Sequence, residues 1–190
     1  MGRILDDKDR ELISLLEEDP ELSQREIADN LGLSQPSVGM RLKKLKENGA
    51  ISFQVGVDLR KSGLYLAKVE ITTKDPSMVL NFFKDCPYFL NGMAMSGRNN
   101  LCLFLMGEDL ASIEAIVNTH LRADPRIDNV DFDVIISSTH DLIFPVKMKI
   151  EKQDKQPCGY DIECKDCSYF KADRCLGCPV IGQYRGHFWG

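Results

Sequence analysis

Cysteines are the residues of this sequence best able to do chemistry, because five of its seven fall between residues 158 and 190. They are Cys158, Cys164, Cys167, Cys175 and Cys178. The last four form two Cys-x-x-Cys pairs, and each pair can present two thiolates to one metal ion. Thiolates select zinc or iron–sulfur clusters over magnesium and calcium, because soft sulfur suits those metals. In a reducing compartment this spacing is more typical of metal binding or redox chemistry than of structural disulfides.

The spacing of these cysteines leaves the choice of metal open. Cys164, Cys167, Cys175 and Cys178 can close a tetrahedral zinc site, with Cys158 as a fifth candidate ligand. The interval between the two pairs is shorter than the roughly 15 to 20 residues usual in zinc sites, which leaves room for an iron–sulfur cluster. The pattern slightly favours zinc, with a cluster as the alternative. The metal-free interpretations are an unmetallated dithiol pair and a structural disulfide.

The segment that holds these cysteines is short and polar, so it has too little apolar material to fold alone. A bound metal can supply the missing folding free energy. His187 is a candidate substitute ligand. Aromatic residues are expected to shield the site or to cover a neighbouring subunit; they are Tyr160, Tyr169, Phe170, Tyr184, Phe188 and Trp189.

Composition sets limits on the whole chain of 190 residues. It carries a formal net charge of -5, with 43% hydrophobic and 28% charged residues, as expected of a globular protein with two modules and a tail. Because the chain is acidic overall, any contact with DNA must come from a local basic patch. No apolar run approaches the roughly 20 residues of a membrane span, and the N-terminus lacks a signal peptide's apolar core, so we expect a cytoplasmic protein.

The N-terminal residues have the start and stop signals of three short helices. An amphipathic pattern covers residues 5–16. Ser23 and Glu26 have the spacing of a capping box that starts a second helix, and Gly32 ends it, since glycine readily takes the left-handed conformation. Ser34 is placed to cap a third helix that runs to about residue 48.

The third of these helices concentrates positive charge in acidic surroundings. Its apolar residues repeat with helical spacing and face inward, so Ser37, Met40, Arg41 and Lys44 turn outward. Two short helices, a glycine turn and a capped basic helix predict a helix-turn-helix over residues 24–48. Residues 50–58 alternate apolar and polar side chains, which is typical of a strand and fits a wing.

Residues 5–60 resemble the DNA-binding half of the Lrp/AsnC family of bacterial and archaeal transcriptional regulators. The resemblance is carried by LDDKDRELISLLEED, LSQREIADNLGLSQPSVGMRLKKLKENGAI and VDLRKSGL. In that family the third helix enters the major groove of DNA. The resemblance therefore implies contacts with bases or phosphates from Ser34, Gln35, Ser37, Met40, Arg41 and Lys44.

The middle of the chain has a repeating order of elements. It reads strand 65–72, helix 76–84, strand 88–96, strand 100–106, helix 110–121 and strand 130–137. This βαββαβ order predicts a ferredoxin-like α+β domain. It also resembles the family's second domain, which pairs into dimers and larger assemblies and binds amino acids or other small effectors. The resemblance covers about residues 5–145 and implies a homodimer or higher homo-oligomer on double-stranded DNA.

The turn at residues 96–100 departs from the family, whose members often carry an acidic glycine loop there. Gly97, Arg98 and Asn99 are candidate effector-binding residues, because glycine permits close approach and arginine pairs with a carboxylate or phosphate. A plain hairpin turn is the better-supported interpretation. We expect Cys86 and Cys102 to be small buried residues, and we assign no role to His120 or His140.

These patterns divide the chain into a winged helix-turn-helix domain at 1–60, a ferredoxin-like effector and oligomerisation domain at 61–145, a linker at 146–157 and a cysteine-rich tail at 158–190. The predicted function is sequence-specific transcriptional regulation, with a redox or metal response through the tail. One alternative is an enzyme subunit resembling the sirohaem decarboxylases, and another is a metal- or electron-carrying protein. No catalytic constellation is visible, so we do not expect an enzyme.

Overall fold

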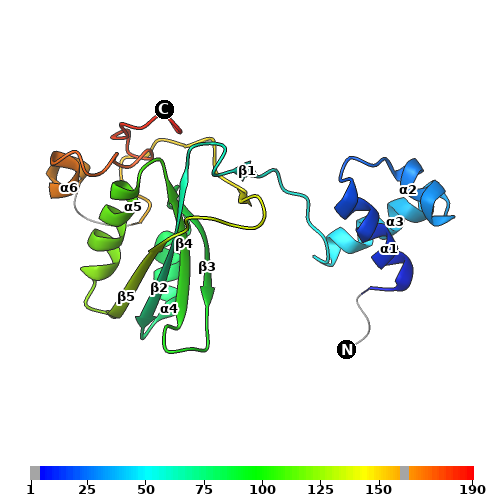
Figure 1. Cartoon of the computed structure of the whole chain (residues 1–190), viewed down its shortest axis with the longest axis horizontal. Helices are drawn as coiled ribbons and strands as arrows, with labels where there is room; N and C mark the ends of the chain where they lie inside the picture. Colours follow the sequence, from blue (N-terminus) through cyan, green and yellow to red (C-terminus); the bar gives the residue numbers. More distant parts are fainter. Residues whose placement is uncertain (1–4, 159–162) are drawn as a thin grey trace. The chain divides into compact units, whose positions relative to one another are not determined.

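The computed structural model describes residues 5–158 and 163–190, which leaves Tyr160 outside the described residues. The chain forms two compact units, residues 1–54 and 55–190 (Figure 1). Within the described parts of the chain, no helix is long and apolar enough to cross a membrane.

The first unit is built from three helices, α1 (Asp7–Glu18), α2 (Gln24–Leu31) and α3 (Gln35–Glu47). The predicted capping box at Ser23 is present, and Gly32 ends α2 in the left-handed conformation, with φ of 63°. Their inward faces share a core of seven buried side chains, because apolar residues at helical spacing form one stripe. These are Leu12, Ile27, Ala28, Leu31, Val38, Leu42 and Leu45.

The strand predicted over residues 50–58 is largely absent, which corrects the expectation for the wing. Residues 51–56 hold no strand. Only β1 (Val57–Asp58) is extended and paired, and its partner is β6 (Ile143–Phe144) within the second unit. The first compact unit comprises residues 1–54, and the strand pair β1–β6 lies in the second.

The second unit contains a four-stranded antiparallel sheet in the order β3–β4–β2–β5. The central strand β2 (Tyr65–Thr73) pairs with β4 (Leu101–Gly107) and β5 (Ile127–Val134), while β3 (Phe89–Ala94) pairs with the outer side of β4. With α4 (Pro76–Phe83) after β2 and α5 (Leu110–Ile116) after β4, the order is the predicted βαββαβ. The predicted α+β sandwich is confirmed.

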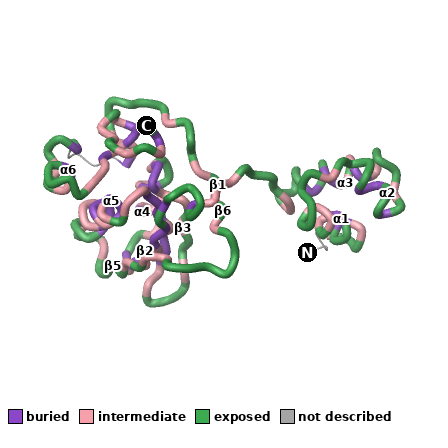
Figure 2. Tube along the Cα trace, turned by 45° about the horizontal axis from the view of Figure 1, so that its top comes forward, coloured by how far each residue is buried: buried purple, intermediate pink, exposed green. Residues whose placement is uncertain are grey.

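The core of the second unit lies between this sheet and its two helices, where buried residues concentrate (Figure 2). Val79 and Phe83 of α4 and Ile113 and Ile116 of α5 pack there against strand residues such as Val69. The helix predicted over 110–121 continues beyond α5 as a π-helical segment, η1 (Val117–Arg122). Single π-helical turns are frequent at functional sites because they re-aim side chains.

The C-terminal tail packs onto the second unit. It contains two short helical turns, η2 (Cys164–Asp166) and α6 (Ser168–Lys171), and α6 lies beside α5 (Figure 1). Trp189 belongs to the main core and is only 9% exposed. The expected linker at 146–157 holds no helix or strand but is fixed to the unit, because Trp189 donates to Lys147 O at 3.0 Å and Gln153 N donates to Val180 O at 2.8 Å.

Candidate DNA interface and cysteine cavity

Helix α3 presents most of its predicted contact residues to the surface. Ser34 caps the helix, and its hydroxyl lies 2.8 Å from that of Ser37, which is half-buried. Gln35 and Lys44 are exposed, and Met40 is 68% exposed, which is unusual for a large apolar side chain. These residues have chemistry suited to DNA: amides read adenine, apolar groups contact the thymine methyl, and lysine binds phosphate.

Arg41 does not point freely outward as predicted, since its guanidinium joins α3 to the start of α1. It donates to Asp6 Oδ2 at 2.7 Å and to Asp9 Oδ1 at 2.6 Å. The side chain of Asp9 is only 6% exposed, so this carboxylate has its charge balanced by Arg41 in a nearly dry setting. Hydrogen bonding from Arg41 holds the pKa of Asp6 below its ordinary value. Arg41 is therefore a structural brace within the first unit.

The predicted effector loop is tied into the sheet. Asn99 Nδ2 donates to Asp131 Oδ2 at 3.0 Å, and Asn100 exchanges two hydrogen bonds with the backbone of Thr73. Gly97 and Arg98 are exposed at its tip. These contacts are those of a hairpin turn, and an effector role for Gly97, Arg98 and Asn99 stays a prediction.

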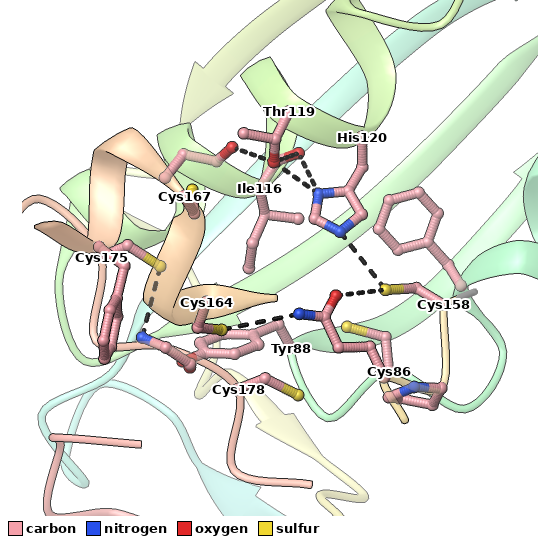
Figure 3. A pocket seen from close by; sticks show the side chains of 16 residues that line it. Cys86, Tyr88, Ile116, Thr119, His120, Cys158, Cys164, Cys167, Cys175 and Cys178 are labelled. Carbon is pink, nitrogen blue, oxygen red and sulfur yellow. Dashed lines mark hydrogen bonds between the residues drawn. The ribbon is translucent and has the colours of Figure 1, made fainter. Parts of the chain in front are cut away.

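Six of the seven cysteines line one cavity of about 70 Å³ in the second unit, which we call the cysteine cavity (Figure 3). The tail contributes all five of its cysteines to this lining, and their role as metal ligands stays a prediction. Cys86 enters from the end of α4, and His120 enters from η1. The remaining wall is mostly apolar and includes Phe83, Ala115, Ile116 and Phe170. Among the described residues, no three Cys, His, Asp or Glu side chains converge closely enough to hold a metal ion as they lie.

His120 has its ring fixed by the π-helical segment. Its Nδ1 lies 3.1 Å from Ile116 O and 2.7 Å from the Thr119 hydroxyl. Burial lowers its pKa to about 4, so the ring is neutral at neutral pH. Because a carbonyl oxygen can only accept, Nδ1 carries the proton and Nε2 carries the lone pair. Nε2 lies 3.4 Å from Cys158 Sγ, inside the cavity (Figure 3).

Backbone N–H groups point at the sulfurs of the Cys-x-x-Cys pairs. Gly177 N donates to Cys175 Sγ at 3.4 Å. The nearby N–H groups of Val180 and Ile181 act to lower the pKa of Cys178, and the N–H of Cys178 acts to lower that of Cys164. Such bonds stabilise thiolates and tune the metals that they bind.

Burial acts against these bonds and keeps the thiols protonated when no cation is near. It raises the pKa of Cys175 and of Cys178 to about 11, and it raises the pKa of Cys164 as well. A cation that binds in the cavity must therefore displace protons from sulfur.

The loop between Cys175 and Cys178 is hydrogen-bonded to the residue before β3 and to α5. Tyr88 donates its hydroxyl to Gly177 O at 2.6 Å, and Leu176 N donates to the buried Ser112 hydroxyl at 2.8 Å. Gly177 has φ of 85°, and a Cβ there would lie 2.1 Å from Gln183 O, so only glycine fits. These bonds join the loop to α5 and to the start of β3.

The end of the tail is held by the carboxylate of Glu108. It accepts from the backbone N–H groups of His187 and Phe188 at 2.9 to 3.0 Å. His187 is exposed and does not line the cysteine cavity, so the structure gives no support to its prediction as a substitute ligand. Phe170 does line the cavity, as expected of a shielding aromatic residue.

Comparisons with known proteins identify the class of protein. A family model described as winged helix-turn-helix DNA-binding matches residues 5–52. LrpC of Bacillus subtilis, an HTH-type transcriptional regulator, is 30% identical over 135 residues, which span 69% of this chain and 94% of LrpC. PH0061 of Pyrococcus horikoshii, an uncharacterized HTH-type transcriptional regulator, is 30% identical over 138 residues, which span 70% of this chain and 93% of PH0061.

Solved structures agree with these sequence matches. The structure of Bacillus subtilis LrpC aligns with a TM-score of 0.62 at 28% identity, covering 74% of this chain and 99% of that chain. The crystal structure of PH0061 aligns with a TM-score of 0.64 at 29% identity, covering 74% and 97%.

The fold and these relatives define a DNA-binding transcriptional regulator rather than an enzyme. The chain belongs to the Lrp/AsnC family of helix-turn-helix regulators.

Proposed function

We propose that this regulator binds specific duplex sequences through α3 and that a thiolate-bound metal in the cysteine cavity controls this binding. One observation carries the proposal: both Cys-x-x-Cys pairs line a cavity whose other walls are α4 and α5–η1 of the regulatory sandwich. A ligand in this cavity touches the tail and the sandwich at once. It therefore favours one arrangement of the second unit over another, as control of a distant site requires.

The proposed ligands are Cys164, Cys167, Cys175 and Cys178. Support comes from the N–H groups directed at three of these sulfurs and from the position of all four on the cavity wall. Because the side chains do not converge on one point as they lie, they would have to move to close a site around a metal. Four sulfurs suit zinc or an iron–sulfur cluster.

On the DNA side, we assign base contacts to Gln35, Ser37 and Met40, and a phosphate contact to Lys44. The support is their surface position on a capped helix whose opposite face is buried. Ser34, as the N-cap at the positive end of α3, is placed for a phosphate. Arg41 contributes indirectly by fixing α3 on α1, because its guanidinium is engaged by two carboxylates.

We further propose that two or more copies assemble through the open face of the sheet. On this face Phe104 of β4 pairs in register with Lys68 of β2, and Met93 of β3 is 45% exposed. Lys68 is bound by Glu70 at 3.2 Å and Asp133 at 3.3 Å, so its charge is already balanced. A two-fold assembly presents two α3 helices to the half-sites of a pseudo-palindrome.

A DNA-binding titration in three states of the protein tests this function. A duplex is first selected from a random library with metal-loaded protein, and its affinity is then measured for loaded, chelator-treated and oxidised protein at one salt concentration. The proposal expects different affinities for the loaded and chelated forms. Equal affinity in all three states would refute the proposal that the cysteine cavity controls DNA binding. It would leave the proposal that α3 binds DNA intact.

A further inference from the structure

The cysteine cavity has more space than a single zinc ion needs. A closed zinc site holds four sulfurs about 2.3 Å from the metal, which leaves no free volume among them. The cavity here measures about 70 Å³ with six cysteines around it. By the same measure one water molecule needs about 10 to 15 Å³, so several atoms fit inside.

The walls of the cavity suit a sulfur-rich, water-poor group. Apart from the cysteines, Gln156 and His120, they are formed mainly by Phe83, Ala115, Ile116 and Phe170. Water in such a space finds few hydrogen-bond partners. An iron–sulfur cluster fits these walls, because its core carries inorganic sulfide and its potential depends on N–H bonds to the cysteine sulfurs.

Positive charge lies close to the same wall. Arg185 stacks on Phe170, with its guanidinium carbon 3.7 Å from the ring centroid, and donates to Phe170 O at 3.3 Å. The Arg185 guanidinium also pairs with Asp173, so its charge is partly balanced and offsets only part of the cost of burying a negatively charged cluster.

The two thiols outside the Cys-x-x-Cys pairs belong to the opposite side of the cavity. Cys158 Sγ lies 3.4 Å from His120 Nε2 and 3.7 Å from Gln156 Oε1. Cys86 lies in the turn that closes α4, where its backbone N–H is bonded to Phe83 O at 2.8 Å. Cys86 therefore belongs to the sandwich, and Cys158 follows directly on the segment at 146–157. The four paired cysteines, in contrast, lie within residues 164–178.

We propose that the cysteine cavity takes an iron–sulfur cluster ligated by Cys164, Cys167, Cys175 and Cys178, in place of a single zinc ion. This inference rests on the proposed function, in which the same four cysteines hold a metal. Cys86, Cys158 and His120 form the wall through which the sandwich contacts the cluster.

The test uses the full chain, purified without oxygen and then incubated with ferric and ferrous iron and sulfide. Iron, zinc and acid-labile sulfide are measured per chain, together with the absorbance spectrum. We expect iron and sulfide in equal amounts, about two or about four of each, and a broad band at about 400 nm. Cys102→Ser is the matched control, because Cys102 is buried in β4 and does not line the cavity.

Each outcome decides between the two proposals. One zinc per chain, without sulfide or colour, overturns the cluster and leaves the proposed metal site intact. Neither iron nor zinc above the level of a Cys164→Ser Cys175→Ser variant overturns both. Loss of iron in Cys158→Ser, with full iron in Cys167→Ser, overturns the assignment of ligands.

A second measurement does not depend on variants that fold. X-ray absorption at the iron edge of the wild-type protein should show sulfur neighbours and a second shell of iron. Sulfur or oxygen neighbours without iron at the second-shell distance would overturn the cluster.

Discussion

Replacing Arg41 with alanine should weaken the fold of the first unit before it affects any contact with DNA. The substitution leaves the Asp9 carboxylate, 6% exposed, without the guanidinium 2.6 Å away. Breaking a fully buried ion pair costs about 3 to 5 kcal/mol, whereas an exposed pair is worth about 0 to 1 kcal/mol. Because the Arg41 side chain is 30% exposed, we expect an intermediate loss of about 2 kcal/mol in the free energy of unfolding.

Urea unfolding followed by circular dichroism measures this loss. With an m-value of about 1 kcal/mol/M for so small a unit, the midpoint of the helical transition should fall by about 2 M. The only tryptophan, Trp189, lies in the second unit, so its fluorescence reports a separate transition that should not move. Lys44→Ala is the matched control on the same helix, and it should leave both midpoints unchanged.

A second substitution, at Asp9, isolates the effect of the unpaired buried charge on stability. Adding Asp9→Asn to Arg41→Ala should recover part of the lost stability, because the amide removes the uncompensated charge. The brace explanation is refuted if Arg41→Ala unfolds at the wild-type midpoint while it loses as much DNA affinity as Lys44→Ala.

Three further predictions follow from the same structure. Lys44→Ala should lower DNA affinity and reduce the slope of log K against log salt by about one, while Lys74→Ala should leave that slope unchanged; equal slopes for both would exclude the phosphate contact. Gly177→Ala should abolish metal binding, because its Cβ meets backbone at 2.1 Å, whereas Gly182→Ala has a similar φ in open space and should retain it; equal metal content, measured by mass spectrometry, would contradict this geometry. The pKa of Asp6 is lowered on folding, so its stabilising contribution is present above the ordinary carboxyl pKa and is lost as the pH falls through the lowered value. Acid unfolding of an Asp6→Asn variant should therefore be less steep than that of wild type, and an identical pH profile would count against it.

Local signals were enough to predict most of the fold. The capping box at Ser23 and the glycine at residue 32 depend on neighbouring backbone groups, so they mark the ends of α2 without knowledge of the rest of the chain. The βαββαβ order was equally readable, because apolar alternation and Asp caps mark each element. The two Cys-x-x-Cys pairs were recognisable from the spacing of their cysteines alone.

Contacts between distant segments account for the predictions that failed. β1 pairs with β6, which lies far along the chain at Ile143–Phe144, so the alternation at residues 50–58 says nothing about its partner. Arg41 is bound by Asp6 and Asp9 at the start of α1. In the sequence these acidic residues are fully explained as the capping residues of that helix. Neither the partner of β1 nor the partners of Arg41 can be predicted from the neighbouring sequence.

Cys86 and His120 line the cysteine cavity, but the sequence alone could not assign them to it. Each is an isolated residue, Cys86 in the turn after α4 and His120 in η1, where burial is the ordinary interpretation. Only the folded tail brings them beside the paired cysteines.

The measurement closest to the central claim is the ratio of DNA affinities for metal-loaded and metal-depleted protein, compared between wild type and Cys175→Ser Cys178→Ser. The same selected duplex and salt concentration serve for both, with Cys102→Ser as the control. We predict a ratio well away from one for wild type and Cys102→Ser, and a ratio of one for the double variant. Wild-type protein that binds equally well in both states, with its metal content verified, would contradict the account.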